Sequence, residues 1–75
     1  RDLWGADLSN ANLSGANLTK AWMESADLTS ANLSGTNLRN AWLEDANLTN
    51  ANVTGADLSG ANLQGATMPD GTIHD

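Results

Sequence analysis

Apolar residues recur along this chain with a period of five. Cut into consecutive pentapeptides, the 75 residues give fifteen units, and the third place of every unit is apolar. That place holds eleven Leu together with Met23, Val53, Met68 and Ile73. The first place is Ala in twelve units, and the exceptions are Arg1, Thr36 and Gly71. A pattern this regular indicates a repeat protein in which every unit has the same local structure.

A period of five fits neither of the standard secondary structures. An α-helix completes a turn in about 3.6 residues, so it would spread the third-place residues around its whole circumference. A flat strand alternates with period two and would turn every other third-place residue to the opposite face. The first and third places are two apart, however, so a short extended segment points both side chains the same way. The Ser, Thr, Asn, Asp and Gly of the other places favour a turn before the next unit.

A second period, of twenty residues, sets the number of units in one circuit. Gly15, Gly35 and Gly55 are twenty apart, and so are Trp22 and Trp42, which replace the usual Asn or Asp of the second place. Twenty residues are four units, which predicts a four-sided coil. Neighbouring coils should pair as parallel strands about 4.8 Å apart. The 75 residues would then make about 3.75 coils.

The units resemble the A-(D/N)-L-x-x consensus of the pentapeptide-repeat protein family over the whole chain. The resemblance implies an all-β fold, a right-handed quadrilateral parallel β-helix, in which the third-place residue and the preceding small residue face inward. Residues 1–75 are therefore expected to form a single solenoid domain. The closing segment 66–75 resembles the degenerate last repeats of cyanobacterial members. Pro69, which has no backbone N–H, suits the end of a β-stack.

The composition argues against several classes of partner. Nine Asp and Glu stand against three Lys and Arg, which gives a formal net charge of −6. Such a chain is repelled by phosphate, so direct binding to nucleic acid or to an anionic membrane is disfavoured. There is no Cys to form a disulfide or a thiolate metal site. No apolar run approaches the length needed to insert into a membrane.

The ends of the predicted stack raise a separate expectation. The chain begins with Arg1, already inside a repeat, and we therefore expect it to be a piece of a longer protein. Both ends of the stack would expose unpaired strand edges, which flanking repeats, a cap or end-to-end self-association would cover. The compartment is left open between the cytoplasm and a tether through a membrane segment outside this sequence.

Tryptophan marks the strongest candidate for a binding face. Trp22 and Trp42 are predicted to project outward from adjacent coils, and Trp4 lies on the same side two places along. Exposed aromatic clusters often mark the surfaces that contact partners. The alternative is a structural stack that stiffens one wall, because cross-strand aromatic pairs stabilise sheets without any partner. Glu24 and Glu44 lie beside the Trp residues and complete the candidate interaction face.

Asp45 joins Glu24 and Glu44 in an acidic cluster on that side. Hard cations bind several carboxylate oxygens, but a flat wall offers no enclosing loop. A solvated acidic face is the preferred interpretation, and no metal site or cofactor is predicted. The stacked Asp and Asn of the second place are interpreted as structural ladders along the solenoid axis. These columns are Asp7 above Asp27, and Asn12 above Asn32 and Asn52.

His74 is expected one coil below Thr54, in a column with Ser14 and Ser34. A hydroxyl beside an imidazole superficially suggests nucleophilic catalysis. Catalysis also needs a pocket and an oxyanion site, and a convex terminal coil provides neither. We therefore predict no catalytic residue and no enzyme.

The chain also contains five Asn-x-Ser/Thr sequences, which the consensus itself generates. Glycans on adjacent coils would lie about 4.8 Å apart and would collide, so we discount all of them as glycosylation sites. The five positions are Asn12, Asn17, Asn32, Asn47 and Asn52.

Together these patterns favour a non-catalytic structural or protein-interaction module with an unidentified protein partner. The resemblance adds that cyanobacterial members occur appended to membrane proteins, which would make this an appended domain of a membrane-associated protein. The alternative is a DNA mimic that inhibits a topoisomerase such as gyrase, as some family members do. Those members are longer, favour Phe at the central place and dimerise through a C-terminal element. This chain has no Phe and no such element.

Overall fold

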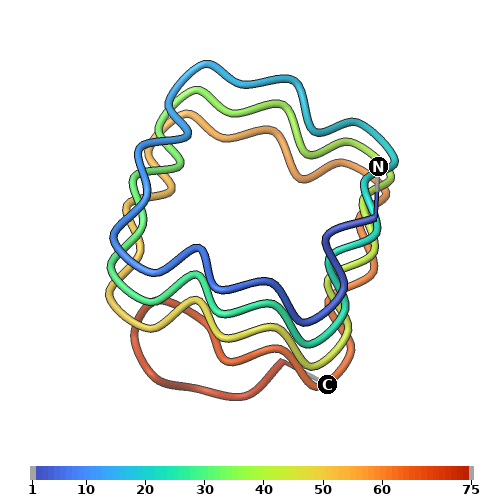
Figure 1. The fold of residues 1–75 in the computed structure, drawn as a ribbon, viewed down its shortest axis with the longest axis vertical. Helices are drawn as coiled ribbons and strands as arrows, with labels where there is room; N and C mark the ends of the chain where they lie inside the picture. Colours follow the sequence, from blue (N-terminus) through green and yellow to red (C-terminus); the bar gives the residue numbers. More distant parts are fainter. Residues whose placement is uncertain (1, 75) are drawn as a thin grey trace.

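The computed structural model describes residues 2–74, which wind into a stack of four-sided coils. Figure 1 shows successive coils lying over one another around the same outline. The described chain forms no helix, and each regular unit contributes a single β-bridge at its second place and a turn over its fourth and fifth places. The prediction of an all-β repeat fold is confirmed. The predicted domain boundaries at Arg1 and Asp75 lie outside the described residues.

Backbone hydrogen bonds join each coil to the next with a constant offset. Every parallel bridge pairs second-place residues that are twenty apart, so one circuit takes four units. The third-place N–H of Met23 donates to the carbonyl of Trp42 at 2.8 Å, and the fifth-place N–H of Ser25 donates to the carbonyl of Glu44 at 2.9 Å. In the opposite direction, the N–H of Trp42 donates to the carbonyl of Ala21 at 2.9 Å. These three bonds repeat from unit to unit and fix every residue in a column.

The columns make four walls, which we name by their exposed residues. Each wall contains every fourth unit. The Trp wall consists of residues 2–5, 21–25, 41–45 and 61–65, and the Asp wall consists of 6–10, 26–30, 46–50 and 66–70. The uncharged wall consists of 11–15, 31–35 and 51–55, and the Arg wall consists of 16–20, 36–40 and 56–60.

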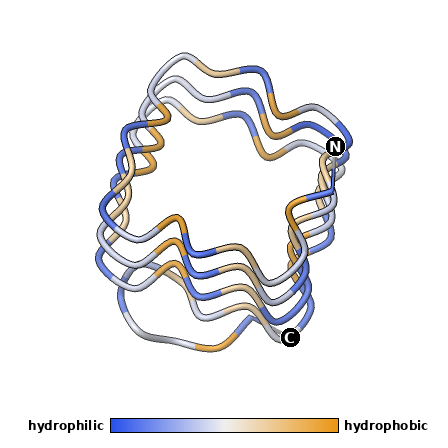
Figure 2. Ribbon diagram, in the orientation of Figure 1, coloured by the Kyte–Doolittle hydropathy of each residue, from blue (hydrophilic) through white to orange (hydrophobic). Residues whose placement is uncertain are grey.

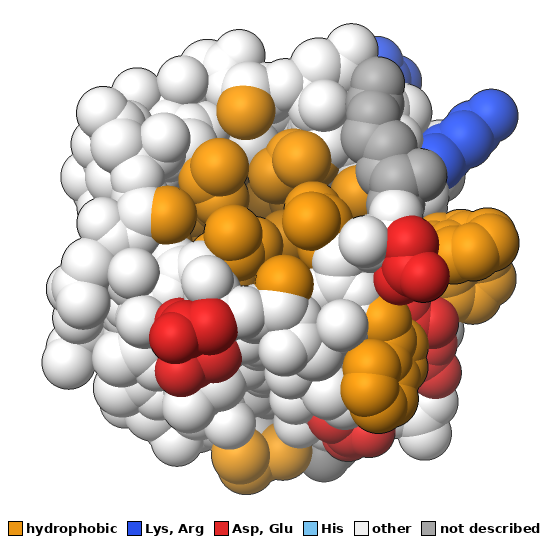
Figure 3. Space-filling model, in the orientation of Figure 1, with side chains coloured by type: hydrophobic (Ala, Val, Ile, Leu, Met, Phe, Trp, Pro, Cys, Tyr) orange, Lys and Arg blue, Asp and Glu red, His pale blue; other side chains and the backbone are white. Residues whose placement is uncertain are grey.

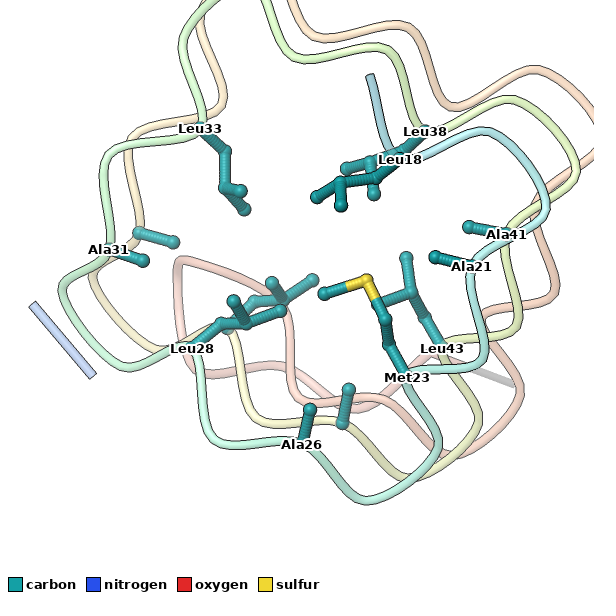
Figure 4. Close-up of a cluster of buried hydrophobic side chains, with 13 residues drawn as sticks. Leu18, Ala21, Met23, Ala26, Leu28, Ala31, Leu33, Leu38, Ala41 and Leu43 are labelled. Atoms are coloured by element: carbon teal, nitrogen blue, oxygen red, sulfur yellow. The ribbon is translucent and has the colours of Figure 1, made fainter. Parts of the chain in front are cut away.

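First-place and third-place side chains fill the interior, as the period of five predicts. Third-place residues of the middle coils, such as Met23, Leu28 and Leu43, have no exposed surface. Their side chains point inward from all sides, with the first-place Ala residues between them (Figure 4). Hydrophobic residues occupy matching places in successive coils (Figure 2). The interior is therefore filled by side chains, and those of the middle coils are closed off from solvent.

One buried first-place residue is polar. Thr36 is fully buried where most units have Ala, and its hydroxyl donates to the carbonyl of Leu13 at 2.7 Å. A buried hydroxyl without a partner would be costly. This bond therefore explains how the interior tolerates Thr36.

The turn between units explains the residues of the fifth place. The N–H of Ala26 donates to the carbonyl of Met23 at 3.1 Å and closes a four-residue turn. Every fifth-place residue from Gly5 to Gly65 has a positive φ, as the third residue of a type II turn requires. Gly accepts this conformation without strain, and Asn accepts it better than most residues. Seven fifth-place residues other than Gly adopt it with φ between 59° and 62°: Asn10, Lys20, Ser25, Ser30, Asn40, Asp45 and Asn50.

The second-place Asn and Asp residues stabilise the same turn from outside. The Oδ1 atom of Asn32 accepts from the backbone N–H of Ser34 at 3.0 Å and from its hydroxyl at 2.8 Å. All eleven Asn and Asp of the second place accept from the N–H two residues ahead. Their structural role is as expected, but these bonds are local Asx turns and do not run along the axis. The Oδ1 atoms therefore accept within their own units and do not form the predicted ladder of side-chain bonds along the axis.

The last unit departs from the predicted coil. Parallel pairing ends at Thr67, which then pairs in the antiparallel direction with Ile73. The N–H of Met68 donates to the carbonyl of Thr72 at 2.7 Å. Gly71, with a φ of 87°, provides the left-handed residue of the turn in place of the fifth-place Asp70. The chain therefore reverses before the fifteenth unit can continue the coil, and the prediction of 3.75 coils is wrong at this end.

The reversed segment covers one edge of the stack. It places the carbonyl of His74 2.8 Å from the N–H of Gly65 and its N–H 2.8 Å from the carbonyl of Ala66. In the regular part of the stack, the N–H of Gly65 and the carbonyl of Ala66 would hydrogen-bond to the next coil. Figure 1 shows the red C-terminal segment leaving the stacked outline. The antiparallel hairpin therefore caps the edge of the Asp wall and the adjoining corner of the Trp wall.

Three Asp side chains of these turns carry a titratable contribution to stability. A hydroxyl two residues ahead, followed by the backbone N–H of the same residue, lowers the pKa of each carboxyl below its usual 3.8. A lowered pKa in the folded state stabilises the fold above the pKa of the unfolded chain, and this contribution disappears as the pH falls through the folded value. The three residues are Asp7, Asp57 and Asp70.

We predict that the triple variant Asp7→Asn/Asp57→Asn/Asp70→Asn loses less stability in acid than the wild type. Asn keeps the Oδ1 acceptor of each turn and removes the proton-binding group. Urea unfolding at neutral pH and well below pH 3.8 measures the fall in unfolding free energy for both proteins. An equal fall in the two proteins would contradict the assignment.

Candidate functional site

Three Trp side chains stand outside the core on one wall. Their exposed fractions are 66% for Trp4, 55% for Trp22 and 44% for Trp42. Trp22 and Trp42 are bridged in parallel register, so their side chains leave the wall from adjacent coils. Trp4 is in the fourth place of the first unit, next to that column. The structure therefore brings together the Trp residues of the predicted interaction face.

The two Glu residues of that predicted face lie in the fourth-place column, directly below Trp4. Trp4, Glu24 and Glu44 succeed one another at the same place of consecutive coils of the Trp wall. Figure 3 shows hydrophobic and acidic side chains next to one another at the right-hand edge of the molecule. Exposed Asp45 occupies the fifth place of the same wall. All five residues predicted for the interaction face, and Asp45, thus share one wall.

The Trp units lack the local bond that stabilises the other turns. In eleven other units an Asn or Asp side chain accepts at the second place, and a Ser or Thr often donates at the fourth. In the two units with Trp at the second place, an indole replaces the acceptor and a Glu replaces the hydroxyl. The pairs are Trp22 with Glu24, and Trp42 with Glu44. Both halves of the local bond are therefore replaced together, twice, in adjacent coils.

Glu24 carries an unpaired acceptor. Its Oε1 atom is buried and has no hydrogen-bond partner among the residues that the structure describes. A buried carboxylate oxygen without a donor is unfavourable, because it has lost its contact with water. The Trp wall thus contains a group whose hydrogen-bonding capacity the fold leaves unused.

The charged side chains are unevenly distributed among the four walls. Seven of the eight described carboxylate side chains lie on the Trp wall and the Asp wall, and the described residues of these two walls include no Lys or Arg. The uncharged wall has no charged side chain.

Sequence reasoning missed Asp2, which is bridged to Trp22 at the top of the Trp column. Its twenty-residue spacing from Trp22 was the signal that could have placed it.

His74 does not lie where the repeat predicts. It is hydrogen-bonded below Gly65 and Ala66, and not one coil below Thr54, because the chain reverses at Gly71. The suspected hydroxyl–imidazole column with Ser14 and Ser34 is therefore not formed.

The wall also lacks the enclosed geometry of several kinds of site. Residues 2–74 enclose no pocket, and no three His, Asp or Glu side chains among them are grouped to hold a metal ion. Within the same residues, no helix is long and apolar enough to cross a membrane. What the Trp wall offers is a flat surface of aromatic and acidic groups.

The repeat and its four-sided coil identify the family. The family model described as pentapeptide repeats matches residues 2–29 and 31–68 with eight copies. The chain belongs to the pentapeptide-repeat family. No curated protein sequence matches it.

Solved pentapeptide-repeat proteins have a similar structure. HetL, involved in heterocyst differentiation regulation in the cyanobacterium Nostoc sp. strain PCC 7120, is 44% identical with a TM-score of 0.72, over 97% of this chain and 36% of HetL. Rfr23 from the cyanobacterium Cyanothece 51142 is 50% identical with a TM-score of 0.55, over 87% of this chain and 48% of Rfr23. AT2G44920 from the Arabidopsis thaliana thylakoid lumen is 40% identical with a TM-score of 0.57, over 84% of this chain and 40% of that protein. This pentapeptide-repeat chain thus spans less than half the length of each of these three proteins.

We predict that the double variant Trp22→Asn/Trp42→Asn folds normally, with an unfolding free energy within about 1 kcal/mol of the wild type. Each Asn restores an Oδ1 acceptor for the N–H of Glu24 or Glu44, worth about 1 kcal/mol. The lost aromatic pair is worth a similar amount, about 0.5–1.5 kcal/mol.

Circular dichroism and urea unfolding measure the effect of the Trp22→Asn/Trp42→Asn substitutions. Asn12→Asp/Asn32→Asp, at the same places of the uncharged wall, is the matched control, because it too exchanges the second-place residues of adjacent coils and retains the Oδ1 acceptor. A loss of about 3 kcal/mol or more for the Trp variant would show that the Trp pair is there to stabilise the wall.

Proposed function

We propose that this chain is a non-catalytic protein-interaction module whose partner contacts the Trp wall. The observation that carries the proposal is the paired replacement at Trp22 with Glu24 and at Trp42 with Glu44. These units lack the local turn bond and place large aromatic groups in solvent. Exposed Trp is the residue type most enriched in the energetically important parts of protein interfaces.

The uncharged wall supports this assignment by contrast. Its units keep Asn at the second place and a hydroxyl at the fourth, and Asn12, Asn32 and Asn52 all form the local turn bond. That wall therefore keeps the second-place consensus residue and the local turn bond in all three of its units. The Trp wall departs from this pattern at adjacent coils, and the departure concentrates aromatic groups and carboxylates on one surface.

The ends of the stack are proposed to associate with further pentapeptide coils. Leu3, Leu8 and Leu13 of the first coil are partly buried, whereas Leu28 and Leu33, one coil below two of them, have no exposed surface. Figure 3 shows hydrophobic side chains gathered in the middle of one end of the stack. Another coil placed on this end would bury them and pair the free strand edge. Coils of a second copy can do this end to end.

We propose a right-handed winding for the coils, as the resemblance to the family implies. The right-handed twist that L-residues impose on strands supports it. The comparisons add no support for the alternative of a topoisomerase inhibitor or for membrane association.

Affinity capture from an extract of the source organism tests the proposed role. Wild-type chain should retain a partner that Trp22→Asn/Trp42→Asn retains at least about tenfold less, because hot-spot residues each contribute about 2 kcal/mol or more. Thr54→Gln, at an exposed place of the uncharged wall, is the control and should capture the same partner as the wild type. Equal capture by the Trp variant would remove the interaction role from this wall.

A further inference from the structure

We propose that the Trp wall binds an arginine-bearing segment of its protein partner, an inference that rests on the interaction role proposed above. The partner's guanidinium groups would stack on the exposed indoles and donate hydrogen bonds to the neighbouring carboxylates. The contact surface consists of Trp4, Trp22, Trp42, Glu24, Glu44 and Asp45.

Charge complementarity selects a cationic partner. The described part of the Trp wall carries four carboxylates and no Lys or Arg, and the adjoining Asp wall carries three more carboxylates. The two described cations, Lys20 and Arg39, both lie on the Arg wall, where Arg39 faces Asp57 with an N–O distance of 3.6 Å. Two copies of the Trp wall would repel one another, because like charges placed together are destabilising. A basic segment of another protein meets the opposite sign and is attracted.

The arrangement of aromatic and acidic groups favours arginine as the cation. A guanidinium is planar, so it stacks on an indole face and can donate two parallel hydrogen bonds to one carboxylate. Trp22 and Glu24 stand two places apart on the same wall, and Trp42 and Glu44 repeat the pair in the next coil. A single Trp–Glu pair would offer one such position. Two pairs in register offer two positions on one surface, which suits a segment with more than one Arg.

The unpaired oxygen of Glu24 adds a second reason. Its Oε1 atom is buried and lacks a donor among the described residues, so the negative charge of the Glu24 carboxylate is poorly compensated and a cation placed beside the group stabilises it. An arginine side chain supplies five N–H donors and accepts no hydrogen bond. Binding would therefore compensate a negative charge that the isolated fold leaves without a donor.

The flatness of the wall favours a segment of a protein over a small molecule. Small ligands are usually held in concave sites that bury most of their surface. The described residues enclose no pocket, whereas side chains spaced along an extended segment can reach successive coils of a flat wall.

The test uses a short fluorescein-labelled peptide that alternates Arg with Ser, titrated with the full chain at physiological salt and followed by fluorescence anisotropy. We expect saturable binding that is about tenfold weaker for Glu24→Gln/Glu44→Gln and for Trp22→Asn/Trp42→Asn. The same peptide with Lys in place of Arg should bind several-fold more weakly. Circular dichroism of each variant confirms that the coil is intact.

Asp7→Asn/Asp27→Asn is the matched control. It removes the same number of negative charges from the Asp wall, puts the consensus residue at both places and keeps both Oδ1 acceptors. Its affinity for the Arg peptide should stay within about twofold of the wild type, apart from the general effect of net charge that salt screens. Equal weakening by this control, or no saturable binding to the wild type, would overturn the proposal.

The two proposals fail in different ways. If a captured partner depends on Trp22 and Trp42 but not on Glu24 and Glu44, and the Arg peptide does not bind, the interaction role stands and the arginine inference is wrong. If the Arg peptide binds through Glu24 and Glu44 while Trp22→Asn/Trp42→Asn leaves both peptide binding and partner capture unchanged, the indoles have no part in recognition. In that outcome the role proposed for the Trp residues and the stacking proposed for arginine both fail.

Discussion

The backbone pairing between coils is the constraint on which the rest of this structure depends. Each regular unit hydrogen-bonds to the unit twenty residues away, so every side chain is aligned with others of the same place. The core follows from this alignment, because first-place and third-place residues of all units meet in the interior. So does the surface, because any departure from the consensus that recurs after twenty residues becomes a column on one wall. Trp22 and Trp42 are such a departure.

The local turn permits this pairing, and the Trp units show that the turn forms without the Asx bond. A left-handed residue at the fifth place and an Asx bond from the second place reverse the chain at each corner. The Trp units keep the left-handed residue, at Ser25 and Asp45, but have no Asx bond. The coil is nevertheless continuous there, because the backbone bonds to the adjacent coils remain. The second place is therefore the position where the repeat can exchange local stability for a surface group.

Much of the fold could be predicted from the sequence, for reasons that also explain the errors. The columns of Gly and Trp revealed the twenty-residue offset directly. Segment 71–75 misled the prediction, because Ile73 keeps the apolar third place although Gly71 moves the turn by one residue and reverses the chain. Stacked amides suit both axial ladders and Asx turns, so the Asn columns alone do not distinguish the two. The hydroxyl two residues ahead of many of these Asn residues favours the Asx turn. Of the candidate site, the Trp and Glu residues could be placed on one wall, whereas the buried oxygen of Glu24 depends on side-chain packing that no spacing encodes.

The Trp units lack the local turn bond, while the coil around them stays intact. Amide hydrogen exchange measured residue by residue tests this difference most directly. We expect the fourth-place amides of Glu24 and Glu44 to exchange faster than those of Thr29 and Ser34, whose N–H groups donate to Asp27 and Asn32. We also expect the third-place amides of Met23 and Leu28, bonded between coils, to be equally protected. Fourth-place amides that exchange at the same rate on all walls would contradict this expectation.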